Sequence, residues 1–219
     1  MKRKLLLVLA PLLLAGGLKA QELKTTVDSL SYAIGVDVAN TFKQQNIAIN
    51  AEVFSKAVHA ALADRAVMTA EQCSDFIRNY FTNQSMRTAK ENKERGDAFL
   101  LKNKEEEGTV TLPSGLQYRI LQEGSGEKPT LENRVRVHYA GQTLDGNEFD
   151  SSIRRGEPAE FGLTQVIRGW TEVLQLMPVG SKWKVFIPQN LAYGEQAPPS
   201  IGPNQVLIFD IELLEIIRP

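Results

Sequence analysis

Residues 165–177 read QVIRGWTEVLQLM, and the organisation of the second half of the chain follows from them. Trp170, Val173, Leu174 and Met177 recur at steps of three and four residues, which predicts a short helix with one apolar face. An isolated tryptophan at this spacing fills a core more often than it lines a binding site. These residues alone therefore leave open whether Trp170 is a core residue or lies at the mouth of a pocket.

Alternation of apolar and polar residues on both sides of this helix predicts the strands of an antiparallel sheet. The residues expected on its buried face are Leu116, Tyr118, Ile120, Val135, Val137, Tyr139, Leu207, Phe209, Ile211 and Leu213. Turn residues occupy 123–126 and 145–147, and a short apolar strand over 159–163 leads into the helix. The second half is therefore predicted to be a compact α+β domain, with a curved antiparallel sheet packed on a short helix.

The first half has helical periodicity instead. Asp28 or Ser29 is expected to cap a first helix, and Asn50 a second. Apolar stripes follow at Leu30, Ile34, Val38 and Phe42, at Val53, Phe54, Val58 and Leu62, and at Phe76, Ile77, Tyr80 and Phe81. Because so small a segment buries these stripes poorly by itself, we expect an all-α domain that pairs with a second copy as a homodimer.

Residues 82–107 keep the helical pattern but become polar, with many charged side chains. A helix that is polar all round is either a solvent-exposed bridge or unstable alone. We expect this one to bridge two domains, with Gly96 as the position where it could bend.

The first 20 residues have the features of a targeting signal. Lys2, Arg3 and Lys4 form a basic start, residues 5–14 are an apolar run, and cleavage is expected after Ala20. The apolar run is shorter than the ~20 residues that a membrane-spanning helix requires. We therefore expect a signal peptide over 1–20, a helical dimerisation domain with its linker helix over 21–107, and a second domain over 108–219. The protein is expected to be exported, to the periplasm, without a stable membrane anchor.

Composition argues against several kinds of function. The net charge of -1 gives no indication of nucleic-acid binding. Cys73 is the single cysteine, and His59 and His138 are far apart in sequence, so neither a disulfide nor a metal or cofactor site is predicted. No hydrolase, nucleotide-binding or metalloprotease motif is present. The second half offers aromatic and aliphatic side chains with a few hydroxyls, which suit an apolar binding pocket.

Four segments carry a resemblance to a known family: YAGQTLDGNEFDSS from Tyr139, QVIRGWTEVLQLMPVG from Gln165, LAYG from Leu191 and IGPNQVLIFDIELLEI from Ile201. Together they closely resemble the FK506-binding-protein (FKBP)-type peptidyl-prolyl cis-trans isomerases, over about residues 113–217. The segment DSLSYAIGVDVANTFKQQ, from Asp28, is similar to the helical dimerisation domain of exported bacterial members. Those members are of the macrophage-infectivity-potentiator and periplasmic-chaperone type.

The resemblance implies roles for individual residues. Trp170 would be the floor under the substrate proline, while the backbone N–H of Ile167 and the hydroxyl of Tyr193 would donate to substrate carbonyls. Asp150 would lie at the pocket edge, held by Arg155 or by the hydroxyl of Tyr139. The residues expected to complete the substrate-binding walls are Tyr139, Phe149, Phe161, Val166, Ile201 and Phe209. Without the resemblance, Asp150 could equally be the cap of a turn at a strand end.

The resemblance also implies partners and an activity. We expect an isomerase without a cofactor that assists the folding of exported proteins, acting on proline-containing, unfolded or partly folded chains. Macrolides of the FK506 and rapamycin kind are the expected inhibitors. The alternative is a chaperone or binding module that grips apolar segments with little turnover. A purely structural envelope protein is disfavoured, because nothing in the sequence is repetitive.

Overall fold

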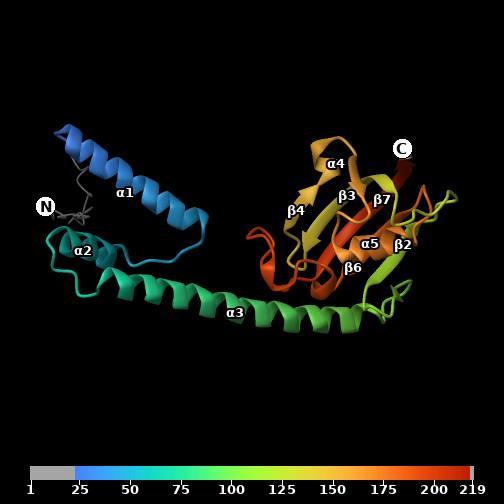
Figure 1. The fold of residues 1–219 in the computed structure, drawn as a ribbon, viewed down its shortest axis with the longest axis horizontal. Coiled ribbons are helices and arrows are strands. Elements are labelled where there is room, and N and C mark those ends of the chain that lie inside the picture. The colour runs from blue at the N-terminus through green and yellow to red at the C-terminus, as the bar shows by residue number, and fades with distance from the viewer. Residues whose placement is uncertain (1–22, 218–219) are drawn as a thin grey trace, which may run out of the picture. The chain divides into compact units, whose positions relative to one another are not determined.

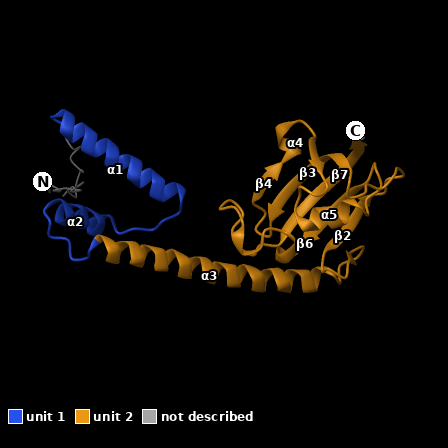
Figure 2. Ribbon diagram, viewed as in Figure 1, with its two compact units in different colours: residues 1–69 blue, residues 70–219 orange. Residues whose placement is uncertain are grey.

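The computed structural model describes residues 23–217, so the predicted signal peptide lies outside the described residues. The chain divides into two compact units, residues 1–69 and residues 70–219 (Figure 2). Helices come first and an antiparallel sheet with its helix follows (Figure 1), which confirms the predicted α+β class. Over residues 23–217, no helix combines the length and the apolar character needed to cross a membrane.

The first unit contains helices α1 (Thr26–Gln44) and α2 (Ala51–Leu62). Thr25 caps α1 and Asp28 reaches back to the backbone N–H of Thr25, a reciprocal pair that satisfies two N–H groups at once. The prediction that Asp28 or Ser29 is the cap was therefore wrong, because Asp28 takes the second half of the capping pair. Asn50 caps α2 as predicted, accepting from the backbone N–H groups of Glu52 and Val53.

Helix α3 (Ala70–Asn103) belongs to the second unit, whereas the sequence predicts it as part of the first domain. Its C-terminal half does not run free in solvent. Ala89, Asn92, Gly96 and Asn103 are buried along one face, and the ring of Phe99 lies 5.8 Å from that of Phe186 on the sheet.

Gly96 is a contact point rather than a bend. A Cβ atom at this position would come within 2.7 Å of the Val206 side chain, so the absence of a side chain lets the helix approach the sheet domain. The helix ends at Asn103 instead of continuing to residue 107. There the amide of Asn103 donates to Gln117 over 2.8 Å and accepts from Arg119 over 2.6 Å.

Seven strands form one antiparallel sheet in the order β1-β2-β6-β7-β3-β4, with β5 paired to β3. The strands are β1 (Val110–Thr111), β2 (Gln117–Gln122), β3 (Arg134–Thr143), β4 (Glu148–Ser151), β5 (Ala159–Gly162), β6 (Lys182–Ile187) and β7 (Leu207–Ile217). Every buried position predicted on β3 and β7 is confirmed. On β2 the pattern differs: Gln117 is buried and Ile120 is exposed. Helix α3 covers the Gln117 side of that strand, which the alternation of β2 alone could not reveal.

Helix α5 (Arg168–Leu174) packs on the sheet (Figure 1), where its predicted apolar face is confirmed as buried. It lies on the face opposite to α3, since Val185 and Ile187 of β6 belong to the same core as α5, whereas Phe186 between them contacts Phe99 of α3. Two local features fix its position. The hydroxyl of Thr171 donates to the carbonyl of Leu163 over 2.7 Å, which ties the helix to the end of β5. A Cβ atom on Gly169 would meet the side chain of Ile187 at 2.5 Å, so glycine permits close packing on β6. A short helix α4 (Ser152–Arg155) follows β4, and two 3-10 turns, η1 (Gln189–Leu191) and η2 (Gly194–Gln196), lie between β6 and β7.

Candidate active site

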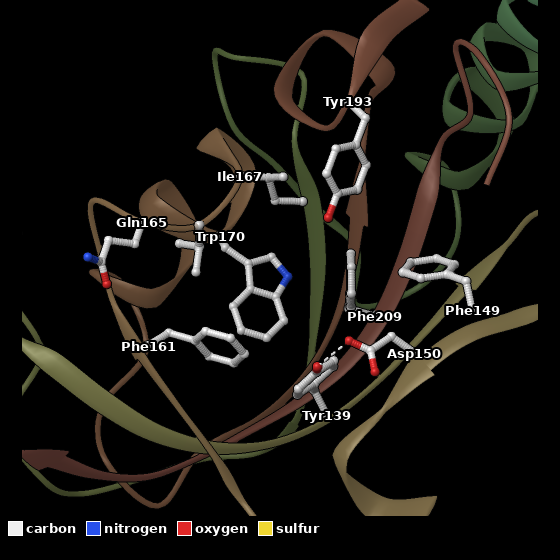
Figure 3. Close-up of a pocket in the computed structure, with 10 residues that line it drawn as sticks. Tyr139, Phe149, Asp150, Phe161, Gln165, Ile167, Trp170, Tyr193 and Phe209 are labelled. Atoms are coloured by element: carbon white, nitrogen blue, oxygen red, sulfur yellow. Dashed lines mark hydrogen bonds between the residues drawn. The ribbon is translucent and has the colours of Figure 1, made fainter. Parts of the chain in front are cut away.

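A cavity of about 340 Å³ opens between α5 and the strands that face it. Its size is within the range of small-molecule and peptide side-chain pockets. Figure 3 shows its side chains arranged around one open space. The residues that line it are Tyr139, Phe149, Asp150, Phe161, Gln165, Val166, Ile167, Trp170, Tyr193 and Phe209.

The indole of Trp170 lies at the centre of an aromatic cluster. The rings of Tyr139, Phe161 and Phe209 meet it edge-to-face, with centroid distances of 5.1, 5.5 and 5.3 Å. Phe149 extends the cluster by a further edge-to-face contact with Phe209 at 5.6 Å. Such arrangements match the negative face of one ring with the positive edge of the next, and they hold the rings in defined orientations. The pocket floor and walls are therefore one connected packing unit.

Gly141 on β3 makes room for two of these rings. A Cβ atom at this position would lie 2.5 Å from a ring carbon of Phe209 and 2.8 Å from one of Phe149. Any side chain here would displace both walls. The glycine of the YAGQ segment is therefore required by the cavity itself rather than by a turn.

A hydrogen-bonded ion pair forms the polar edge of the cavity. Asp150 lies on β4, directly opposite Gly141 in the ladder with β3. Its carboxylate accepts from the hydroxyl of Tyr139 and from the guanidinium of Arg155. Arg155 also donates to the Tyr139 hydroxyl over 3.1 Å, and its guanidinium lies 5.7 Å from the centre of the Tyr139 ring. The three side chains form a closed triangle.

This triangle changes the ionisation of its members. Burial by itself would raise the pKa of Asp150, but the hydrogen bonds from Tyr139 and Arg155, together with the positive charge of Arg155, outweigh it. The pKa of Asp150 is therefore lowered from its usual value. Burial and then the bond to Asp150 raise the pKa of the Tyr139 hydroxyl. At neutral pH the site holds an ionised carboxylate and a protonated phenol.

Two further groups face the open space as hydrogen-bond donors. The hydroxyl of Tyr193 and the indole nitrogen of Trp170 both point into it (Figure 3). Burial and the nearby charge of Asp150 raise the pKa of Tyr193, so this hydroxyl keeps its proton. The buried indole N–H of Trp170 has no hydrogen-bond partner within residues 23–217, which leaves it available to an acceptor on a ligand. Ile167 immediately precedes α5 and lines the same space.

The structure brings together nearly all the residues that the sequence singled out. Ile201 is the exception: it is buried in the core and does not line the cavity. Arg155 does not line the cavity itself but is bonded to Asp150 and Tyr139, which do. Gln165 lines the cavity and was not among the expected site residues, although it opens the QVIRGW segment. Ser151 rather than Asp150 caps α4, while the carboxylate of Asp150 is bonded to Tyr139 and Arg155.

The arrangement suits non-covalent binding of an apolar group next to hydrogen-bonding carbonyls. Within the described part of the chain, no three His, Cys, Asp or Glu side chains are grouped so that they could hold a metal ion. The donors face an apolar floor, which is the pattern of a pocket that orients a ligand by a few polar contacts.

Comparisons with known proteins agree with this geometry. Residues 125–214 match the family model described as FKBP-type peptidyl-prolyl cis-trans isomerase, and residues 27–120 match the domain amino terminal to it. The chain is 45% identical to the outer membrane protein MIP of Legionella longbeachae, over 90% of this chain and 88% of that protein. It is 42% identical to the FKBP-type peptidyl-prolyl cis-trans isomerase FkpA of Aeromonas hydrophila, over 90% and 79%. The crystal structure of FkpA from Escherichia coli superposes with a TM-score of 0.69 at 32% identity, covering 89% of this chain and 98% of that one.

The ion pair predicts a measurable titration. In the wild-type protein the carboxyl of Asp150 should titrate below the usual value of about 3.9. Arg155→Gln should raise that pKa, because burial then acts with less compensation. Carboxyl carbon chemical shifts followed by NMR against pH measure both.

The same variant should change stability in a pH-dependent way. Because the pKa of Asp150 is lowered on folding, its ion pair stabilises the fold above the usual aspartate pKa, and this contribution is lost as the pH falls through the folded value. Arg155→Gln should therefore have a lower free energy of unfolding than the wild type at pH 7. This difference should disappear at acid pH, where Asp150 is protonated in both proteins. Arg154→Gln is the control, since Arg154 pairs with Glu148 and should leave Asp150 unchanged. An Asp150 pKa that Arg155→Gln does not raise would contradict this account.

Proposed function

The chain belongs to the FKBP-type peptidyl-prolyl cis-trans isomerases, and we propose that the aromatic cavity around Trp170 is the site at which it isomerises X-Pro bonds. The activity itself, in the folding of proteins that contain proline, follows from the family. The proposal rests on one observation above all: two hydrogen-bond donors, the Tyr193 hydroxyl and the Trp170 indole N–H, point into a cavity of about 340 Å³ with aromatic walls. No covalent step is required by this arrangement.

Rotation about an X-Pro bond is opposed by amide resonance. The barrier of about 18–20 kcal/mol reflects the loss of that resonance in the twisted transition state. The twisted amide is less polar than the planar one, so a dry, apolar pocket favours it relative to the ground state. Lowering the barrier by about 4 kcal/mol would accelerate rotation roughly a thousandfold. Desolvation by the aromatic walls and fixed donors on the flanking carbonyls can both contribute.

The proposed roles follow from where each group lies. The proline ring rests on the face of Trp170, between Tyr139, Phe161 and Phe209. The hydroxyl of Tyr193 and the backbone N–H of Ile167 donate to the carbonyls on either side of the proline. These directional donors hold the flanking chain while the amide twists. The aromatic walls of the cavity exclude water from the X-Pro bond that rotates.

Asp150 acts by orientation and by its field rather than by proton transfer. Isomerisation moves no proton, so general acid–base catalysis has no step to serve. The carboxylate is instead fixed by Tyr139 and Arg155, and it keeps the Tyr139 ring in its place against Trp170. Its negative charge also acts on Tyr193 and helps to raise the pKa of that hydroxyl.

The helical region is proposed to make the protein a homodimer. Neither α1 nor α2 has a buried residue in the single chain, and both carry exposed apolar side chains. Leu30 and Ile34 on α1 and Val53 and Leu62 on α2 are more than half exposed. A symmetric pairing would cover such stripes, as in most soluble oligomers. A dimer would have two pockets, and once one of them holds a client chain, the second would meet that same chain at a high effective concentration.

Export is proposed from the sequence of residues 1–20. A basic start followed by a short apolar run is typical of a cleaved signal peptide, and the periplasm is the proposed destination. The relative in Legionella longbeachae is named an outer membrane protein. Cleavage after Ala20 would leave Gln21 as the first residue of the mature protein, which N-terminal sequencing tests.

Truncation of Trp170 is expected to remove most of the isomerase activity. Trp170→Ala deletes the pocket floor and should lower kcat/KM on a proline tetrapeptide by about tenfold or more. Because truncating a buried aromatic costs about 3–5 kcal/mol of stability, the folded fraction must be measured by denaturant titration alongside. A macrolide of the FK506 kind should inhibit the wild type and bind this variant more weakly.

Trp183→Phe is the matched control. Trp183 is equally buried and lies on β6, stacked on Tyr118 outside the cavity, so this variant should lose stability but keep its activity per folded molecule. Full activity in Trp170→Ala would refute the pocket assignment. A pocket that binds proline peptides and macrolides without turnover would instead favour the binding-module interpretation.

The mature protein is expected to have twice the mass of one chain in light scattering. Ile34→Glu, on the apolar stripe of α1, should shift it to a monomer by placing a charge in the paired surface. Asn40→Glu, off the stripe on the same helix, should remain dimeric. A fragment of residues 86–219, which keeps the packed part of α3, should be monomeric and active on a tetrapeptide. A monomeric mature protein would disprove the pairing.

A further inference from the structure

The segment that follows Tyr193 forms a closed loop between the cavity and helix α3. Tyr193 immediately precedes η2, and the chain returns to β7 at Leu207. The backbone N–H of Asn204 donates to the carbonyl of Gly194 over 2.8 Å, which joins the two ends of the loop. This bond closes residues 194–204 into a loop whose first residue directly follows Tyr193.

Two asparagines attach this loop to α3 through a reciprocal pair of hydrogen bonds. The amide of Asn92 on α3 donates to the carbonyl of Pro203 over 2.8 Å. The amide of Asn204 in the loop donates to the carbonyl of Ala89 over 3.3 Å. Asn92 and Asn204 are both more than nine-tenths buried, so breaking either hydrogen bond leaves a buried amide unpaired.

The backbone of the loop is suited to this attachment. Asn204 has a φ of 52°, a left-handed conformation that asparagine tolerates better than most residues. Gly96, one turn along the same face of α3, accommodates Val206 at the end of the loop. On its other side the loop is held by Ile201, whose side chain is buried in the core. The loop thus has one fixed contact with the core and two hydrogen bonds to α3.

Tyr193 itself has little else to fix it. Its hydroxyl points into the cavity (Figure 3), and the ring is 41% exposed. No hydrogen bond within residues 23–217 is recorded for this hydroxyl, in contrast to Tyr139, which is held by Asp150 and Arg155. The aim of the Tyr193 hydroxyl is therefore determined by the backbone that carries it.

We propose that Asn92 and Asn204 are positioning residues for the isomerase reaction, and that α3 aims the Tyr193 hydroxyl by holding the loop of residues 194–204. The proposal rests on the donor role proposed for Tyr193. On this proposal the C-terminal half of α3 contributes to the active site through the loop, although no residue of that helix lines the cavity. Effects of this kind are large in principle, since a displacement of about 1 Å at a donor can cost up to 100-fold in rate.

A double-mutant cycle in the full-length protein tests the coupling. Asn92→Ala should lower kcat/KM on a proline tetrapeptide by about threefold to tenfold, chiefly through kcat, because the donor is misplaced in the transition state. In the Tyr193→Phe background, where there is no hydroxyl to aim, the same substitution should change kcat/KM by less than about twofold. Asn83→Ala, the same substitution at an exposed position of α3, is the control and should leave the rate unchanged.

A second variant and a second measurement separate this proposal from a general loss of stability. Asn204→Gly keeps the left-handed backbone and removes only the amide, so it should reproduce the kinetic effect of Asn92→Ala. Hydrogen exchange should accelerate in residues 194–204 of both variants and stay unchanged in β3 and β7. Unchanged exchange in the loop would overturn the anchoring. Equal losses with and without the Tyr193 hydroxyl would overturn the coupling. A fully active Tyr193→Phe would refute the donor role under the proposed function, and with it the aiming of that hydroxyl, whereas the exchange data would still decide the anchoring.

Discussion

The packing of the Trp170 indole against Tyr139, Phe161 and Phe209 is the interaction on which the second unit depends. It joins α5 to three neighbouring strands of the sheet, since Tyr139 lies on β3, Phe161 on β5 and Phe209 on β7. The same rings leave a cavity because they meet edge-to-face and do not stack flat. Two glycines make this possible, Gly169 by admitting the helix to β6 and Gly141 by leaving space for the walls. Stability and binding surface therefore come from the same contacts, and a change that fills the cavity also strains the core.

Local periodicity predicted the parts of the fold that depend on one buried face. The alternation on β3 and β7 and the three-and-four spacing after Gln165 each describe an element with one side in the core, and burial follows the pattern at each of those positions. The pattern failed where a second element covers the other side. Gln117 reads as a surface residue of β2, but α3 lies over it and its amide is bonded to Asn103 and to the carbonyl of Leu100. A polar helix gives no periodic signal of such packing, because its contacts mix amides and a glycine with only a few apolar side chains, among them Ala89 and Phe99.

The site was predictable to the extent that its residues are aromatic and belong to recognisable segments. Trp170, Tyr139, Phe149 and Phe209 meet as the resemblance implied, but nothing in residue spacing shows that four elements bring them to one cavity. Ile201 illustrates the limit, since it occurs in a matching segment yet its side chain is buried in the core. Arg155 illustrates the opposite case. Its link to both Asp150 and Tyr139 depends on the short helix α4, which turns the chain back towards β3 just after the aspartate.

The cavity also contains polar groups that the fold leaves unpaired, and their cost explains why its frame is so firmly fixed. A buried donor without a partner, such as the indole N–H of Trp170, costs about 1–3 kcal/mol relative to a satisfied one. In a flexible pocket the Trp170 indole could rotate until its N–H reached water or a backbone carbonyl, and that cost would be removed. The Thr171 bond to Leu163 holds α5 at the end of β5, and the edge-to-face contacts with Tyr139, Phe161 and Phe209 oppose rotation of the indole. The indole N–H of Trp170 stays directed into the cavity, where we propose that a substrate carbonyl lies, so that binding supplies a hydrogen bond that folding alone does not. Under the proposal that α3 aims the Tyr193 hydroxyl, the long helix supports the pocket through its two hydrogen bonds to the 194–204 loop, in addition to linking the two units.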